Sequence, residues 1–336
     1  IYPVIAVGLG CHESFFDSIV ANGPTLSRAI HYPSMNDVPD SGHVWAAEHG
    51  DINLITALPR ATTNGLQVKL KDGDWVDAVA PEGTVQHVAL TTGLKHYLGP
   101  FEAYAKAQPD TPFSEEQERL PYPNFYYEQE DILWAAAARD GFQWSVHRPH
   151  TLIGWALGNA MNMGVTLAVY AAICRETGMR FHFPGSQEQW EAVTDVTDAR
   201  LLADHLVWAA TTPAAANEAL NIVNGDVFRW RRLWPRLAAA LGVEPEGWNG
   251  TPAPLEQQMA GVAEEVWPRI VRQHGLRDIP VGVLASWWHT DADLGRTIET
   301  FTSMARSRQL GFAGVQDSES SFTDLFARLR AERIVP

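Results

Sequence analysis

The chain has few cysteines and a deficit of basic residues. Its 336 residues include two cysteines, Cys11 and Cys174. Two cysteines are too few for a disulfide framework and fit a reducing cytosol. Lysine and arginine number 25 against 40 aspartates and glutamates, which gives a formal net charge of −15 at pH 7. Because general binding to nucleic acid or to anionic membranes needs a basic face, we expect neither kind of partner.

Long hydrophobic runs are also missing. Charged residues or glycines interrupt every apolar stretch well before the length of about 20 residues that a membrane-spanning helix needs. The first residues, IYPVIAVGLG, show no positively charged region in front of an apolar core, and we therefore expect no secretory signal. Together these observations predict a cytoplasmic protein.

What is present is typical of a packed globular protein. Hydrophobic residues make up 46% of the chain and charged residues 19%, so disorder is not expected. The length allows one large domain or two ordinary ones. Segment 42–80 alternates in short runs, with turn signals at Asn64-Gly65 and Asp72-Gly73, and this pattern predicts β-hairpins.

From about residue 84 the pattern changes to strands that alternate with helices. We expect strands at 85–91 (a buried one), 142–149 and 180–185. Helices are expected at 128–140, 160–176, 198–210, 213–219, 229–241 and 255–274, with a last one carrying Phe322, Leu325 and Leu329. This alternation implies an α/β fold with a mainly parallel sheet flanked by helices. The chain would then divide into a β-rich segment, 1–83, and an α/β region, 84–336.

Six stretches of the second region carry a specific pattern. They are TGLKHYLGPFEAYAK (92–106), NFYYEQEDIL (124–133), WSVHRPHTLIG (144–154), NMGVTLAVYAAICRETG (162–178), NEALNIVNGDVFRWR (217–231) and SMARSRQLGF (303–312). In them the sequence resembles the short-chain dehydrogenase/reductase superfamily, in its progesterone 5β-reductase and iridoid synthase-like branch. The resemblance implies a Rossmann-type fold, an NADPH cofactor and reduction of an enone or another apolar carbonyl compound.

The same resemblance assigns a catalytic pair, Lys95 and Tyr126. This branch places the lysine in the TGxKHYxGPFE segment and the tyrosine in NFYY. A free tyrosine has a pKa of about 10, and a neighbouring ammonium lowers it by favouring the phenolate. We therefore expect Lys95 to lower the pKa of Tyr126 and to hold the nicotinamide ribose. Tyr126 would then pass a proton to the substrate carbonyl while the nicotinamide delivers hydride.

Two further segments bear on the cofactor. The residues after HRP resemble the backbone that lines the nicotinamide in this branch, which implicates Pro149, His150, Thr151 and Ile153. A complete member of the family also opens with a β-α-β unit that carries a glycine-rich turn and a basic residue for the NADP phosphate.

The nearest substitute for that turn is VIAVGLGCHESFFDSIV (4–20), with Gly8, Gly10 and, farther on, Arg28. The match is partial. Glu13 stands where the third glycine belongs, and its carboxylate would repel a pyrophosphate.

The first segment has a different resemblance. GCHESFFDSIVANGPTLSRAIHYPS (10–34), AAEHGDINLIT (46–56) and GLQVKLKDGDWVDAVAPEG (65–83) resemble the isopenicillin-N-synthase-like Fe(II)/2-oxoglutarate oxygenases. By this resemblance His49 and Asp51 would be two of three iron ligands, since a strand turns residues i and i+2 to one side.

The third iron ligand is missing where it should fall, because no histidine lies between His96 and His147. We therefore favour the reductase. A mononuclear iron oxygenase and a non-catalytic α/β protein without a complete cofactor site remain as the alternatives.

One more pattern could bind a metal. In WWHTDAD (287–293), His289, Asp291 and Asp293 recur at alternate positions. Since the same segment matches the C-terminal part of the reductase family, we expect a structural role for it. The expected partner of the protein is an apolar small-molecule carbonyl compound, and a homodimer is a possible assembly.

Overall fold

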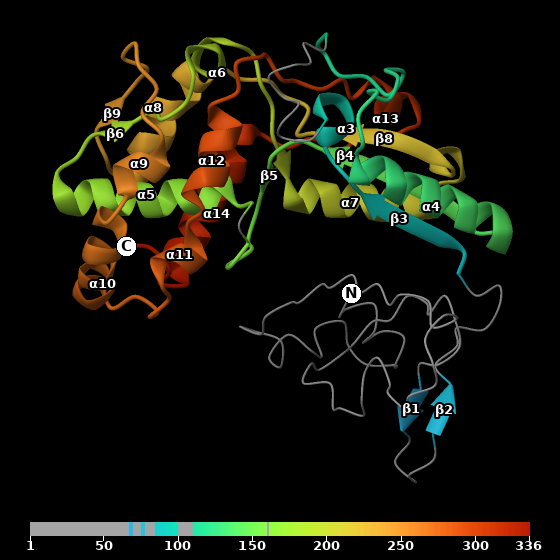
Figure 1. Ribbon diagram of the computed structural model, residues 1–336, viewed down its shortest axis with the longest axis horizontal. Helices are drawn as coiled ribbons and strands as arrows, with labels where there is room; N and C mark the ends of the chain where they lie inside the picture. The colour runs from blue at the N-terminus through green and yellow to red at the C-terminus, as the bar shows by residue number, and fades with distance from the viewer. Residues whose placement is uncertain (1–66, 70–74, 78–84, 100–109, 160) are drawn as a thin grey trace, which may run out of the picture. The chain divides into compact units, whose positions relative to one another are not determined.

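The computed structural model describes residues 67–69, 75–77, 85–99, 110–159 and 161–336 (Figure 1). The chain divides at Pro81 and Glu82 into two units, each of which is described by itself. The predictions made for Gly8, Gly10, Arg28, His49 and Asp51 lie outside the described residues.

In the first unit, strand β1 (Gln67–Lys69) pairs antiparallel with β2 (Trp75–Asp77). This pairing agrees with the hairpin that Asp72-Gly73 predicts. The boundary expected between residues 83 and 84 stays a prediction.

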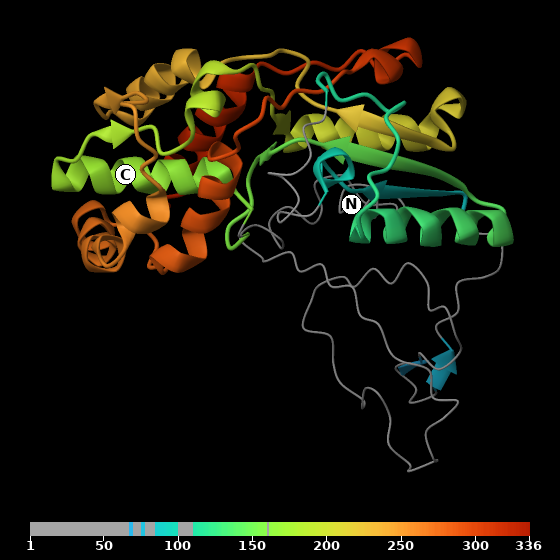
Figure 2. The same ribbon diagram turned by 45° about the horizontal axis from the view of Figure 1, so that its top comes forward.

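A parallel three-stranded sheet organises part of the second unit. Strand β3 (His87–Thr91) pairs with β4 (Gln143–Pro149), and β4 pairs with β8 (Glu218–Ile222). Helices α4 (Phe125–Asp140) and α7 (Ala199–Thr211) pack against it (Figures 1 and 2). The predicted α/β class with parallel strands and flanking helices is thereby confirmed.

The two helices cover opposite faces of the sheet, because successive residues of a strand point to opposite sides. Trp144 and Arg148 of β4 contact side chains of α4. His147 instead contacts His205 of α7. Strand β4 therefore has a face toward α4 and a face toward α7.

Two expectations about strands and helices are wrong. Strand β3 is only partly covered, and β4 is its sole strand partner among the described residues. No helix forms at 213–219. Pro213–Ala215 makes a single 3-10 turn, after which β8 begins at Glu218. Pairing with β4 outweighs the helix propensity of the NEAL sequence, because tertiary context commonly overrides local preference.

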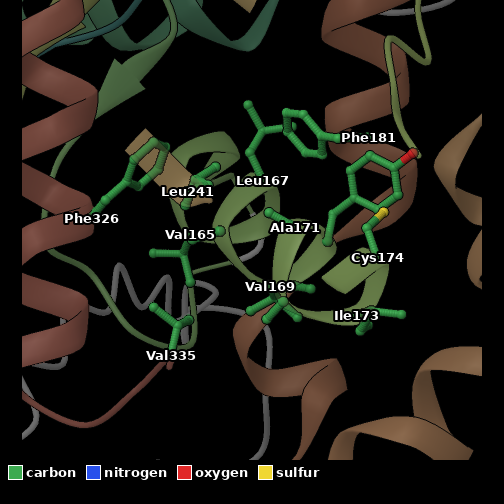
Figure 3. Close-up of a cluster of buried hydrophobic side chains, with 14 of the residues drawn as sticks. Val165, Leu167, Val169, Ala171, Ile173, Cys174, Phe181, Leu241, Phe326 and Val335 are labelled. Atoms are coloured by element: carbon green, nitrogen blue, oxygen red, sulfur yellow. The ribbon is translucent and has the colours of Figure 1, made fainter. Parts of the chain in front are cut away.

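A helical layer holds the largest apolar core. Helix α5 (Met163–Thr177) is buried along most of its length and is contacted by α8 (Trp230–Leu241), α10 (Val262–His274) and α14 (Ser318–Ala331). Figure 3 shows its side chains among Phe181, Leu241 and Phe326. A helix that is apolar all round must be enclosed in this way.

Phe322, Leu325 and Leu329 are all buried on α14, which confirms the last predicted helix. The helix expected at 255–274 is divided, because Gly261 has a positive φ of 74° between α9 (Leu255–Met259) and α10. The short elements are α3 (Lys95–Leu98), β5 (Leu152–Ile153), β6 (Phe181–His182), α6 (Gln187–Glu191), β7 (Thr197–Asp198), β9 (Pro245–Glu246), α11 (Val281–Leu284), α12 (Trp287–Leu294) and α13 (Ala305–Gln309). Among the described helices, none is both long enough and apolar enough to cross a membrane.

Candidate active site

The predicted catalytic residues lie beyond the carboxyl ends of neighbouring parallel strands. Lys95 begins α3, four residues after β3 ends at Thr91. Segment 149–153 starts at Pro149, the last residue of β4, and ends with the short strand β5. The carboxyl ends of parallel strands share one edge of a sheet, and in α/β folds this edge is where ligands bind.

Tyr126 lies in the first turn of α4 and is half-buried. Its hydroxyl faces the chain between β3 and α3. A Cβ placed on Gly93 would lie 3.5 Å from the Tyr126 Oη and 3.3 Å from the carbonyl oxygen of Pro149. The bare backbone of Gly93 therefore leaves a small space in front of the phenol, and it brings Tyr126 and Pro149 together.

Burial raises the pKa of Tyr126. The expected lowering of that pKa is wrong in this structure, because removal of water disfavours the charged phenolate. At neutral pH the phenol therefore carries its proton. It can donate a hydrogen bond or a proton, and it is not a ready base.

The Lys95 side chain extends beside the first residue of α4. Its Nζ lies 5.4 Å from the centre of the Phe125 ring. Burial lowers the pKa of His289, and the charges of Arg296 and Lys95 lower it further. Lys95 thus places a positive charge near both α4 and α12.

Asn124 joins the two predicted catalytic residues. It is the N-cap of α4, and its Oδ1 accepts a hydrogen bond of 3.0 Å from the backbone N of Tyr126. Its Nδ2 donates a hydrogen bond of 2.6 Å to the backbone oxygen of Lys95. Sequence reasoning missed this residue, although asparagine directly before a helix is a recognised capping signal.

Tyr127, the neighbour of Tyr126, is a structural residue. It is buried, its hydroxyl donates a hydrogen bond of 2.5 Å to the backbone oxygen of His96, and it accepts one of 3.0 Å from the backbone N of Leu120. Both hydrogen bonds join α4 to the segments before it. The Tyr127 hydroxyl is therefore occupied within the protein.

A buried carboxylate, that of Glu130, joins α4 to β4. The Glu130 side chain is fully buried, and its oxygens lie 3.0 Å from Arg148 Nη2 and 2.9 Å from Arg119 Nη2. Burial favours the neutral acid, yet the hydrogen bonds and charges of His96, Arg148 and Arg119 hold the pKa of Glu130 at about 2. This ion network fixes the helix that carries Tyr126.

The segment after β4 is held by its side chains. His150 Nδ1 lies 2.6 Å from Asp195 Oδ1, and Arg296 donates a hydrogen bond of 2.8 Å to His150 Nε2. Thr151 donates to Asp293, and Ile153 is buried in the main core. These side chains contact the protein interior. Parts of the backbone are paired as well, since the backbone N of His150 donates to Thr197 Oγ1 and the Thr151 oxygen accepts from the backbone N of Thr197. Contact between this segment and a cofactor stays a prediction.

The WWHTDAD segment forms helix α12 and has the expected structural role. Asp291 accepts hydrogen bonds from the backbone N of Leu255 and of Glu256 at the start of α9, and Asp293 pairs with Arg296. Within the described part of the chain, no group of three or more His, Cys, Asp or Glu side chains could hold a metal ion.

A cavity of about 380 Å³ borders the same helix. Its walls include Trp287 and Trp288 from α12, Val283 from α11, and the loop at Gly158 and Asn159. Its walls also carry the polar side chains of Glu256 and Ser286, so indole surface and polar groups line it together.

The parallel sheet, with Tyr126 and Lys95 at the carboxyl ends of its strands, defines a Rossmann-type α/β protein. Residues 71–336 match the family described as the PRISE-like Rossmann-fold domain. The chain belongs to this family. The match begins inside the segment that resembles an oxygenase, and the comparisons give that resemblance no support.

Several characterised proteins are similar to this chain. (S)-8-oxocitronellyl enol synthase CYC2 of Camptotheca acuminata is 39% identical over 266 residues, which cover 78% of this chain and 68% of that protein. (S)-8-oxocitronellyl enol synthase ISY1 of Nepeta racemosa is 41% identical over 254 residues, 75% of this chain and 65% of that protein. The 3-oxo-Delta(4,5)-steroid 5-beta-reductase of Arabidopsis thaliana is 40% identical over 255 residues, with coverages of 75% and 65%. The chain thus spans 65–68% of the length of these relatives.

Proposed function

We propose that this protein is an NADPH-dependent reductase of enones or other carbonyl small molecules, in which Tyr126 donates the proton. The observation that carries the proposal is the position of the Tyr126 hydroxyl. It faces Gly93, where an added Cβ would also meet the Pro149 carbonyl oxygen, at the carboxyl ends of β3 and β4, with Lys95 on the adjoining helix. Membership of the PRISE-like family supports the same reaction.

The names of the relatives favour an enone as the substrate. One relative acts on a 3-oxo-Δ4,5 steroid, in which the double bond is conjugated with the carbonyl group, and two form an enol. When hydride adds to the carbon β to a carbonyl group, negative charge develops on the carbonyl oxygen. A hydrogen-bond donor aimed at that oxygen lowers the barrier.

The described residues fit the nicotinamide half of NADPH. A Cβ on Gly93 would fill the space in front of the phenol, and only glycine leaves that space open. Lys95 would hold the nicotinamide ribose, and the backbone of 149–153 would line the ring. NADPH supplies the hydride when it is bound.

The chain itself supplies the proton. Because burial raises its pKa, Tyr126 remains protonated at neutral pH and can hydrogen-bond the substrate oxygen as charge develops there. Transfer of the phenolic proton then gives an enol or an alcohol.

The proposed substrate is an apolar small molecule, as the steroid named for one relative suggests. A homodimer and a cytoplasmic location stay predictions. Sedimentation of the purified protein would decide the first, and imaging of a tagged full-length protein in its native cells would decide the second.

The proposal is tested by titrating the purified protein with NADPH and then adding a cyclic enone or the matched saturated ketone. We expect NADPH to quench the tryptophan fluorescence and the enone to be reduced faster than the ketone. Absence of both nucleotide binding and turnover would favour the non-catalytic α/β alternative.

A further inference from the structure

Asn124 contacts both residues of the proposed catalytic pair through one side-chain amide. The amide is buried, with 5% of the residue exposed. Its oxygen accepts from the Tyr126 backbone and its nitrogen donates to the Lys95 backbone. The two partners are 31 positions apart in the sequence and lie on different helices.

The chemistry of the two partners fixes the orientation of the amide. The Lys95 carbonyl can only accept a hydrogen bond, and the Tyr126 N–H can only donate one. Rotating the amide by 180° would place its oxygen against the Lys95 carbonyl oxygen and its NH₂ group against the Tyr126 N–H. One orientation of Asn124 therefore satisfies both bonds, and it fixes the separation of the two main-chain segments.

The hydrogen-bonding needs of both partners can be met without asparagine, so the specific contribution of the Asn124 link is to position the two segments. The Lys95 oxygen also accepts a hydrogen bond of 3.0 Å from the backbone N of Gly99, so it keeps a partner if the amide is lost. The Asn124 oxygen also accounts for capping of α4. Capping by itself can be supplied by serine or aspartate. Only the Nδ2 donor requires asparagine here.

We propose that Asn124 is a positioning residue that sets the placement of Lys95 relative to the Tyr126 phenol. This inference rests on the proposed function. Misplacement of a catalytic group by about 1 Å can reduce turnover by about 10²-fold. Loss of the Nδ2 donor should therefore lower kcat strongly, while most of the protein still folds.

Two variants remove the donor and keep the cap. Asn124→Ser is neutral but shorter, and Asn124→Asp is isosteric but charged. Any effect that both variants share arises from the lost donor, because their changes in volume and charge differ. We expect both variants to lower kcat by about 10²-fold and to displace the pH profile of kcat.

The chain offers a matched control at a second helix cap. Asn162 is also 5% exposed, and its Oδ1 caps α5 by accepting from the backbone N of Val165. Its Nδ2 donates to the backbone oxygens of Gly154 and Ala156. Asn162→Ser thus loses a buried amide donor and keeps a cap. It should lower the thermal midpoint by an amount comparable to that of Asn124→Ser and leave the pH profile unchanged.

A second readout does not depend on turnover. In protein labelled with ¹³C at the tyrosine Cζ, the Tyr126 resonance is assigned from the spectrum of Tyr126→Phe. We expect Asn124→Ser to move that resonance and its titration, and Asn162→Ser to leave both in place. If the wild-type protein reduces no enone, the proposed function fails, and the resonance still decides the role of Asn124. An unchanged Tyr126 resonance, or equal loss of kcat in both serine variants, would overturn the inference.

Discussion

Both faces of β4 carry buried polar side chains, but these side chains differ in charge. Toward α4, Arg148 pairs with Glu130 in an ion network that supports the helix of Tyr126. Toward α7, the contacts are between side chains that can remain neutral. His147 Nδ1 lies 2.8 Å from His205 Nδ1, and His147 Nε2 lies 2.8 Å from Ser145 Oγ.

This difference teaches that one strand can join the layer that carries the proposed catalytic tyrosine to a layer of neutral buried contacts. Two facing imidazole nitrogens can share one proton as donor and acceptor, whereas two protonated rings would repel each other. Burial lowers the pKa of His147 to about 4 and that of His205 to about 3. Loss of the Tyr126 hydroxyl should therefore alter activity, loss of the ion network on the α4 face should lower stability at neutral pH, and changes on the α7 face should alter stability in acid.

The largest effect is expected at Tyr126 itself. Tyr126→Phe removes one hydroxyl group and little volume, so the protein should fold. Since general acid catalysis contributes about 10²–10⁴-fold, kcat should fall by that factor. Steady-state oxidation of NADPH with an enone and with a ketone measures it. An enone should retain more activity than a ketone, because an enolate needs its proton less urgently than an alkoxide.

Breaking the ion network on the α4 face should have the next largest effect. Glu130→Gln leaves Arg148 buried without its charged partner, and losing one member of such a pair costs about 3–5 kcal/mol of unfolding free energy. Denaturant unfolding checks this value. Asp131→Asn is the matched control on the same helix, because Asp131 forms an exposed pair with Arg119 and should cost less than about 1 kcal/mol. Equal losses in the two variants would contradict the account.

Acid should destabilise the contacts on the two faces of β4 over different pH ranges. His147 and His205 are neutral in the folded protein, with pKa values of about 4 and about 3, whereas an unfolded histidine has a pKa of 6.5. As the pH falls from 6.5 to the folded pKa, the unfolded chain takes up protons that the folded protein does not, so the folded protein becomes less stable. Glu130, whose folded pKa is about 2, loses its contribution only below its ordinary pKa of 4.5. The α7 face should therefore weaken first, by a few kcal/mol in total.

Unfolding free energies of the wild-type protein and of His205→Asn, measured from pH 7 to pH 4, test this order. The difference between the two proteins should shrink as the pH falls. A constant difference would show that His205 does not titrate between the folded and unfolded states in this range.

The smallest effect is expected at Tyr127. Tyr127→Phe removes a buried hydroxyl group with two hydrogen bonds, so the unfolding free energy should fall by about 1 kcal/mol. Turnover per folded molecule should stay close to that of the wild type. Parallel melting and kinetic measurements check both values. A kcat loss as large as that of Tyr126→Phe would mean that the NFYY motif has been misread.

Regular periodicity made much of the fold predictable. Residues 142–149 and 229–241 carry strong patterns, and they form β4 and α8 nearly as expected. The helix predicted at 213–219 failed because β8 owes its form to pairing with β4, about seventy positions earlier. Such non-local pairing leaves little local signal in the sequence.

The neighbourhood of Lys95 and Tyr126 was predictable from a motif, and their catalytic roles stay predictions. Lys95 and Tyr126 come from the family pattern, and the structure brings their segments together through Asn124. The pKa of Tyr126 was predicted in the wrong direction, because the degree of burial cannot be read from a motif. The space at Gly93 was missed for a similar reason, since it depends on where Tyr126 and Pro149 lie in three dimensions.

The most direct test of the reductase function follows the hydride. The wild-type protein would be incubated with an enone and with NADPH that carries deuterium at the transferable position of the nicotinamide. The account predicts a reduced product with deuterium on the carbon β to the carbonyl group, formed much more slowly by Tyr126→Phe. A reduced product without deuterium, or equal rates for the two proteins, would contradict it.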